Sequence, residues 1–416
     1  MRSLRILYLH QHFSTPEGAT GTRSFALARA LAARGHAVTL ACGQYAGAAT
    51  GLSGPFRRGR REGQVGPVQV VEFAIPCGNA QGLAARGAAF LRYAAQATKL
   101  ALTGPWDVAV ASSTPLTVAL PALAARRLRG LPFVFEIRDP WPELPRAMGI
   151  GSPPLWAAMD RLADAACRRA AAVVALSEGM GETAVAHGAS PAMVHVVPNG
   201  ADLDLFGPQV PPWRPAEAAS HEALAVYAGA HGRANGLDQL LDAAAWLRAR
   251  RVPLRLLLVG EGGEKPRLMA RAAAEGLDKV TFLDPLPKPR LAGLLAGSQI
   301  GVQCLAPVPE FAEWTAPNKL MDYLAAGLPV VANLPGRAAR LLADGPCGIA
   351  TPPGDAAALG EALAALATDP ARRAALGRAA RVQAVRRWDR RLLAAHFCAV
   401  VESAARPAGA TALAPV

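Results

Sequence analysis

Cysteine, aromatic and acidic residues are all scarce in this chain of 416 residues. The six cysteines lie far apart, with no Cys-x-x-Cys pair and no Cys/His cluster, so we expect neither a disulfide framework nor a zinc site. Phe, Trp and Tyr make up only 6% of the residues, too few to predict base-stacking surfaces for nucleic acid. The N-terminus shows no export signal, because its apolar run is too short. We therefore expect a cytoplasmic protein.

Positive charge exceeds negative charge, with 44 Lys and Arg against 31 Asp and Glu and a net charge of +13. The excess is largest in residues 1–199, which carry 20 basic and 11 acidic residues. Because the basic residues are dispersed along Ala-rich helical segments, we do not expect nucleic acid as a partner. Anionic substrates and an anionic membrane surface both remain compatible with the excess.

One uncharged run, residues 108–125, is long enough to be mistaken for a membrane span. The Ser-Ser-Thr-Pro sequence and Pro121 interrupt this run, which argues against a continuous membrane-spanning helix. The run instead predicts a buried strand, a loop and then a helix.

Short apolar segments alternate with helical segments in two series, which predicts parallel sheets covered by helices on both faces. The segment between the series is rich in Pro and lacks periodicity, as interdomain linkers do. We expect an α/β protein of two tandem Rossmann-like, doubly wound domains that face each other across a cleft. The expected parts are a first domain (1–200), a linker (201–222), a second domain (223–385), a helix packing back across the domains (386–404) and a flexible tail (405–416).

The predicted strands all precede loops at which ligands can bind, because parallel sheets bind ligands beyond their carboxyl ends. In the first series these strands are residues 4–9, 36–43, 68–75, 107–112, 133–137, 171–177 and 194–200. In the second series they are residues 223–230, 254–260, 280–285, 300–305, 328–333 and 348–353.

The loop after the first strand contains Gly18, Gly21 and Arg23 and leads into a helix. The free N–H groups and dipole of a helix start can hold an anion, so this loop is a candidate phosphate-binding site. The spacing is not Gly-x-Gly-x-x-Gly, and a loop that only caps the helix is the alternative.

A dense group of ionisable residues, Glu136, Arg138 and Asp139, follows the strand at 133–137. We expect these side chains to point into the cleft as the catalytic group. A carboxylate there can accept a proton, and Arg138 can neutralise its neighbours or hold an anionic substrate. The alternative is an Arg–Asp pair that only fixes the loop.

The second domain begins with the same pattern of strand, Gly-containing loop and helix, and its loop carries His231 and Arg233. This loop is a second candidate phosphate cradle. Taken alone, His231 is equally well explained as a solvent-exposed loop residue.

The most informative segment contains Pro317, Asn318, Lys319 and Asp322 around the start of a helix. A Lys in the first turn opposes the helix dipole, so its presence favours a bound polyanion. Asp322, one turn later, can bind ribose hydroxyls. The alternative is a surface ion pair between Lys319 and Asp322, three residues apart.

The pair Asp202-Leu203-Asp204 resembles a metal-binding Asp-x-Asp motif. Because it lies at the entrance to the linker, we interpret it as structural. No metal is predicted.

Six separated blocks of the sequence occur in this order: GTRSFALARALAARGHAV, VFEIRDPWPE, VPNGADLDLF, LLLVGEG, VTFLDPL and PNKLMDYLAAGLPVVA. Together they make the chain resemble a family 4 glycosyltransferase of the GT-B fold. The EIRDPWPE and PNKLMDYLAAG forms are most similar to the WbuB-type subgroup, which adds amino sugars such as L-fucosamine during surface polysaccharide assembly.

The resemblance implies a retaining transferase without a metal or other cofactor. It implies a UDP-sugar donor held mainly by the second domain and a lipid-linked or oligosaccharide acceptor held mainly by the first. Asp322 corresponds to the second Glu of the family's Glu-x7-Glu motif, whereas Trp314 occupies the position of the first. Lys288 lies near the loop that meets the base, where backbone groups of Leu286 can read uracil. The family's usual Arg and Lys phosphate clamp is absent as a pair, and Arg233 and Lys319 are its candidate substitutes.

Two other functions fit part of the sequence. A UDP-sugar 2-epimerase shares the two-domain architecture, but it needs more acid/base residues than the second domain's loops provide. A basic, non-enzymatic polyanion-binding protein is the other alternative. For the transferase, the positive first domain and the apolar segment 90–102 predict peripheral contact with the anionic inner face of the plasma membrane.

Overall fold

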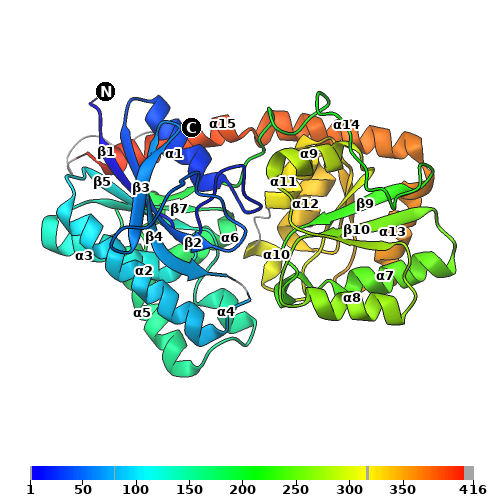
Figure 1. The fold of residues 1–416 in the computed structure, drawn as a ribbon, viewed down its shortest axis with the longest axis horizontal. Helices are drawn as coiled ribbons and strands as arrows, with labels where there is room; N and C mark the ends of the chain where they lie inside the picture. The colour runs from blue at the N-terminus through cyan, green and yellow to red at the C-terminus, as the bar shows by residue number, and fades with distance from the viewer. Residues whose placement is uncertain (1, 79, 315–317, 407–416) are drawn as a thin grey trace.

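The computed structural model describes residues 2–78, 80–314 and 318–406 and contains two α/β domains joined side by side (Figure 1). Pro317 and residues 407–416 of the expected tail lie outside the described residues. The α/β class and the two Rossmann-like domains predicted from the sequence are confirmed.

The first domain is an eight-stranded sheet in the order β3-β4-β2-β1-β5-β6-β7-β8, parallel throughout except for the β3–β4 hairpin. The strands are β1 (Arg5–Leu9), β2 (Ala37–Tyr45), β3 (Arg60–Val65), β4 (Val68–Cys77), β5 (Val108–Ser112), β6 (Phe133–Ile137), β7 (Ala172–Ala175) and β8 (Val194–Val196). The α-helices are α1 (Arg23–Ala33), α2 (Leu83–Thr103), α3 (Ala119–Arg129), α4 (Glu143–Ala147), α5 (Pro153–Arg169) and α6 (Glu178–Ala186). Every residue of β5, β6 and β7 is buried, as expected for strands with both faces covered.

The second domain is a six-stranded, wholly parallel sheet in the order β11-β10-β9-β12-β13-β14. Its strands are β9 (Ala223–Ala228), β10 (Leu254–Val259), β11 (Val280–Leu283), β12 (Ile300–Gln303), β13 (Val330–Ala332) and β14 (Gly348–Ala350). Its helices are α7 (Asp238–Ala249), α8 (Lys265–Ala274), α9 (Lys288–Ala296), α10 (Phe311–Trp314), α11 (Asn318–Ala325), α12 (Gly336–Asp344), α13 (Ala356–Thr368) and α14 (Pro370–Arg387).

The uncharged run at 108–125 forms β5, a 3-10 turn (Leu116–Val118) and the start of α3, as predicted. Within the described part of the chain, no helix is long and apolar enough to cross a membrane.

The chain crosses between the domains twice, and the two crossings are hydrogen-bonded to each other. Ala201 donates its N–H to the Trp388 carbonyl at 2.6 Å, and Arg390 donates its N–H to the Ala201 carbonyl at 3.1 Å. The Arg390 guanidinium also pairs with Asp202 at 2.7 Å, so Asp202 is structural, as we interpreted it.

The last helix, α15 (Arg390–Ala404), returns to the first domain and packs on α1 beside the start of the chain (Figure 1). Phe397 and Val401 are fully buried in the same core as Tyr8 of β1. On its outer end, Glu402 accepts hydrogen bonds from Arg34 at 2.6 and 2.8 Å. The first domain is therefore built from both ends of the sequence.

A histidine joins three helices of the first domain. The two ring nitrogens of His187, after α6, each lie 2.7 Å from a carboxylate, Glu143 of α4 and Asp164 of α5. These hydrogen bonds, mainly that to Glu143, raise the pKa of His187 to about 8. Glu143 and His187, with Asp160, also form a group whose ligand atoms lie within 4.8 Å of one another. Because both nitrogens already bind carboxylates, we interpret the group as an ion-paired link between helices.

We predict that His187 makes stability pH-dependent. Its pKa is higher in the folded chain, about 8, than its ordinary value of 6.5, so its contribution is complete below pH 6.5 and is lost as pH rises through 8. The loss should reach about 2 kcal/mol of unfolding free energy. Urea unfolding between pH 6 and 9 measures it, with His187→Gln as the variant that should flatten this part of the profile. An equal slope in the variant would contradict the assignment.

Candidate active site

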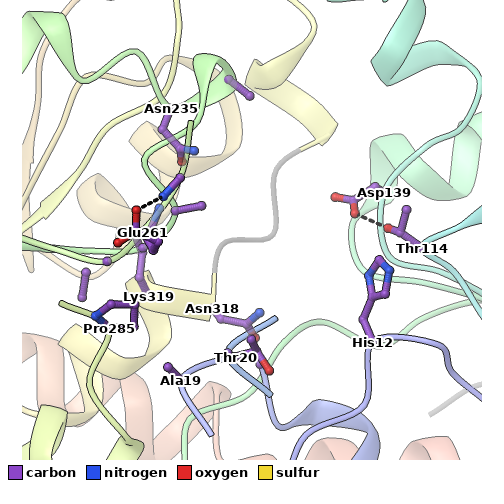
Figure 2. Close-up of a pocket in the computed structure, with 18 of the residues that line it drawn as sticks. His12, Ala19, Thr20, Thr114, Asp139, Asn235, Glu261, Pro285, Asn318 and Lys319 are labelled. Atoms are coloured by element: carbon purple, nitrogen blue, oxygen red, sulfur yellow. Dashed lines mark hydrogen bonds between the residues drawn. The ribbon is translucent and has the colours of Figure 1, made fainter. Parts of the chain in front are cut away.

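A cleft of about 980 Å³ lies between the two domains and is lined by residues from both. The loops after β1, β5 and β6 form one wall, and the loops after β9, β10, β11 and β12, with the start of α11, form the other. All of these loops follow the carboxyl ends of parallel strands, where α/β sheets bind ligands. Figure 2 shows His12, Thr114 and Asp139 facing Asn235, Glu261 and Lys319 across the cleft.

Arg138 is the principal cation of the first-domain wall. Its Nη1 lies 2.7 Å from His10 Nε2, and because Arg only donates, this nitrogen of His10 is the acceptor. The proton of His10 is then on Nδ1, 2.8 Å from Ser24 Oγ. Burial, followed by the charge of Arg138, holds the pKa of His10 well below its usual value. A neutral His10 therefore orients the guanidinium toward the cleft.

His12 and Asp139 complete this wall. Burial, with the nearby charge of Arg138, lowers the pKa of His12 to about 3, so its ring is neutral. The ring lies 4.2 Å from that of Tyr45, and its Nε2 has no hydrogen-bond partner among the described residues. Asp139 accepts a hydrogen bond from Thr114 Oγ1 at 2.6 Å, as Figure 2 shows.

Glu136 does not reach the cleft, which corrects our expectation for it. Its carboxylate is completely buried and accepts hydrogen bonds from Arg23 Nε at 2.9 Å, Ser112 Oγ at 2.5 Å and Tyr8 Oη at 3.1 Å. Burial alone would raise the pKa of Glu136, but Arg23 and Arg138 outweigh it and the pKa is lowered. The ion pair between Arg23 and Glu136 therefore lies in the interior of the first domain, beneath the loops that line the cleft.

Arg23 belongs to the same interior network instead of a phosphate site. Its Nη1 and Nη2 donate to the Pro198 and Val197 carbonyls at 2.6 and 2.8 Å. Gly18 is buried, and a Cβ at this position would lie 2.2 Å from Ser14 Oγ and 2.6 Å from the Ala49 nitrogen. Gly18 does not line the cleft, whereas Gly21 does.

Lys319 is a mostly buried cation in the second-domain wall (Figure 2). Its Nζ lies 3.2 Å from Tyr227 Oη and 4.4 Å from the centre of that ring. Burial lowers its pKa to about 8. Among the described residues no carboxylate lies within ion-pair distance, and Asp322, the predicted alternative partner, pairs instead with Lys288.

Lys288 and Asp322 form a buried ion pair at the floor of the cleft. Lys288 Nζ also lies 5.4 Å from the centre of the Phe206 ring. The pair brings together the loop after β11 and helix α11, so the predicted Leu286, Lys288, Asn318, Lys319 and Asp322 all line one region.

The loops after β9 and β10 pack backbone against backbone. A Cβ on Gly260 would lie 1.9 Å from the Gly229 carbonyl oxygen, and one on Gly262 would lie 2.4 Å from the His231 carbonyl oxygen. Only glycine therefore fits at these two positions, which place bare backbone at the cleft.

Two predicted residues of the loop after β9 do not line the cleft. The His231 ring is fully buried, neither nitrogen has a partner in the described part of the chain, and burial lowers its pKa to about 4. Arg233 is exposed. Ala234 and Asn235 line the cleft in their place.

Trp314, at the position of the motif's first Glu, lines the cleft. The neighbouring Glu313 points its carboxylate to Arg340, at 2.7 Å, while its carbonyl accepts a hydrogen bond from Ser177 Oγ of the first domain at 3.0 Å. Glu178 of α6 also pairs with Arg337 of α12. These contacts join the domains beside the cleft.

Residues 18–200 match a family described as Glycosyl transferase 4-like domain, and residues 222–369 match one described as Glycosyl transferases group 1. The two domains are therefore similar to these glycosyltransferase families. This supports the family-level resemblance drawn from the sequence, whereas the WbuB-type subgroup remains a prediction.

Curated relatives of this chain match over part of their length. A D-inositol 3-phosphate glycosyltransferase of Kribbella flavida is 32% identical over 183 residues, covering 41% of this chain and 42% of the relative. A phosphatidyl-myo-inositol mannosyltransferase of Mycobacterium leprae is 32% identical over 171 residues, covering 41% and 43%. The chain thus spans about two fifths of the length of these relatives.

Solved structures share the whole fold. Sucrose-phosphate synthase from Thermosynechococcus elongatus has a TM-score of 0.75 at 19% identity, over 96% of this chain and 98% of that one. HepE from Anabaena, solved in complex with UDP-glucose, has a TM-score of 0.66 at 18% identity, over 96% and 100%. At sequence identities of 18–19%, this structural similarity establishes the fold alone, which is GT-B.

We predict that Glu136 supports stability and does not act on substrate. Glu136→Ala leaves the buried Arg23 guanidinium without its carboxylate, which should lower the unfolding free energy by about 3–5 kcal/mol. The matched control, Glu62→Ala, removes an exposed carboxylate and should change it by less than about 0.5 kcal/mol. Urea unfolding measures both. If Glu136→Ala lost activity while its unfolding free energy stayed unchanged, Glu136 would have to be assigned a catalytic role.

Proposed function

We propose that this protein is a retaining, metal-independent glycosyltransferase that moves a sugar from a UDP-sugar to a lipid-linked or oligosaccharide acceptor. The observation that carries the proposal is Lys319, a mostly buried ammonium without a carboxylate partner among the described residues, facing a large cleft. A buried cation is costly unless an anion compensates it. A nucleotide diphosphate is such an anion.

The donor occupies the second-domain wall in this proposal. Its diphosphate meets Lys319 and the start of α11, its ribose hydroxyls meet Asp322, and its uracil meets backbone groups around Leu286. Anabaena HepE, solved with UDP-glucose on the same fold, supports a UDP-sugar as donor. In this proposal the ion pair with Lys288 holds the Asp322 carboxylate in place beside the ribose.

The reaction breaks the bond between the anomeric carbon and the diphosphate oxygen and forms one to an acceptor hydroxyl oxygen. As the sugar gains oxocarbenium character, negative charge grows on the leaving diphosphate, which Lys319 and Arg138 stabilise from opposite walls. The acceptor attacks from the same face and transfers its proton to the departing phosphate, so no protein nucleophile is required. In this proposal the neutral His12 and the Asp139 carboxylate, which both line the cleft, orient acceptor hydroxyls.

An amino sugar is our proposed donor sugar and surface polysaccharide the proposed product, both from the sequence resemblance. The curated relatives are named for inositol and mannosyl transfer, so the first activity screen should contain hexose donors as well. An epimerised sugar formed without an acceptor would favour the 2-epimerase alternative.

We predict that UDP binding depends on Lys319. Lys319→Ala removes a charge-assisted contact to the diphosphate and should weaken UDP binding by about 10- to 100-fold in calorimetric titration. Because the pKa of Lys319 is about 8, UDP affinity of the unaltered protein should fall as pH rises through 8. Lys279→Ala, at an exposed lysine of the same domain, is the control. UDP affinity equal in both variants would contradict the donor site.

We further propose that the first domain contacts an anionic membrane through α2. In this helix Leu83 and Leu91 are 63% and 59% exposed, and Arg92 and Lys99 are exposed as well. Exposed apolar and basic side chains of a helix bind the interface of anionic lipid.

Charge reversal on α2 tests this contact. Arg92→Glu with Lys99→Glu should weaken binding to phosphatidylserine-containing vesicles at low salt by about tenfold or more, at roughly 1 kcal/mol per basic residue. The control pair, Arg372→Glu with Arg378→Glu, lies exposed on α14. Equal binding by both double variants, or none by the unaltered protein, would remove the claim. Vesicle co-sedimentation provides the measurement.

A further inference from the structure

A second hollow of about 680 Å³ adjoins the cleft on the first domain. We name it the side groove; it is bordered by residues 44–45 and 48–52, residues 64–66 of the β3–β4 hairpin and the buried Glu72. Tyr45 lines both the side groove and the cleft. The volume of the side groove falls within the range of small-molecule binding sites.

The side groove is held in place by the same loop that forms the cleft wall. Thr15 donates its N–H to the Ala49 carbonyl at 2.8 Å, and Ala19 donates its N–H to the Gly47 carbonyl at 2.8 Å. The Ala49 N–H in turn donates to Ser14 Oγ at 3.1 Å. The groove and the cleft therefore share one rigid border, so a ligand in one has a fixed position relative to the other.

The floor of the side groove is polar but electrically neutral. Arg61 donates two N–H groups to the Glu72 carboxylate, at 2.9 and 3.1 Å, and Thr50 Oγ1 donates to it at 2.5 Å. Glu72 is only 2% exposed. Since each charge is compensated inside the floor, the floor offers no net attraction to an ionic ligand.

The rim favours hydroxyl groups over anions. It carries the amides of Gln44 and Gln64, which can donate and accept, and the carboxylate of Glu17, which repels phosphate or carboxylate ligands. The cleft next to it carries Arg138, Lys288 and Lys319. The lining thus changes from cationic in the cleft to neutral in the side groove. We therefore expect the phosphate groups of the substrates to lie in the cleft and not in the side groove.

We propose that the side groove binds an uncharged sugar residue of the acceptor, adjacent to the residue that receives the transferred sugar. Tyr45 then lies between the two sugars and offers a ring face with a polar hydroxyl. This inference rests on the proposed transferase function, and it predicts that the acceptor is at least a disaccharide. An acceptor of a single sugar would leave the groove unused.

Saturation-transfer NMR on the full chain, with UDP and one neutral disaccharide present together, tests the proposal. The probes are maltose, cellobiose, lactose, chitobiose and mannobiose, with sulfated lactose as the charged counterpart of lactose. Ala48→Trp fills the groove and Gln64→Ala trims its rim, and each should reduce the disaccharide signal about fivefold or more. Gln69→Ala is the matched control, because Gln69 faces Gln64 across the hairpin but lies outside the groove.

The outcomes separate this inference from the proposed function. Absence of a UDP signal in the unaltered protein counts against the transferase itself. A UDP signal with no signal from any of the five disaccharides, equal signals from lactose and sulfated lactose, or equal loss in the Gln69→Ala control would overturn the side-groove proposal alone. The expected result is an unchanged UDP signal in all three variants and a disaccharide signal lost only in the two groove variants.

Discussion

The buried ion pair between Arg23 and Glu136 fixes the parts of the first domain on which the cleft depends. Glu136 belongs to the inner strand β6, and Arg23 is the first residue of α1. From this position Arg23 also holds the Val197 and Pro198 carbonyls, directly before the chain leaves the domain. One guanidinium thus joins the sheet, the first ligand loop and the exit to the second domain. With both charges compensated inside the fold, the interaction is a structural constraint on the cleft walls.

The second domain uses buried charge in the opposite way. Lys288 is compensated by Asp322, whereas Lys319, one turn before Asp322, contacts the Tyr227 hydroxyl and ring and has no carboxylate partner among the described residues. The lowered pKa of Lys319 records the cost of this arrangement. A fold retains such a cost where a ligand removes it. This contrast fits our proposal that the compensated Arg23 supports the fold and that Lys319 binds the donor.

Much of the fold could be predicted from the sequence because its strands are buried on both faces and form uninterrupted apolar runs. Strand β3 was missed because its residues alternate between exposed and half-buried positions and contain few apolar side chains. Glu136 was misplaced because a carboxylate near a strand end has the same local sequence whether it faces a cleft or an arginine 113 positions earlier. His10 and His12 were missed as site residues, although both directly follow β1. Isolated histidines have no spacing signature, and only the packed loops bring them to Arg138 and Tyr45.

The return of α15 to the first domain has a consequence for biosynthesis. Chains generally fold from the N-terminal domain onward as they emerge from the ribosome. Here the core around β1 remains open until Phe397 and Val401 have been made, near the last residues of the sequence. The second domain, complete at α14, can therefore mature before the first one closes. The half of the molecule that is translated first is the half that finishes folding last.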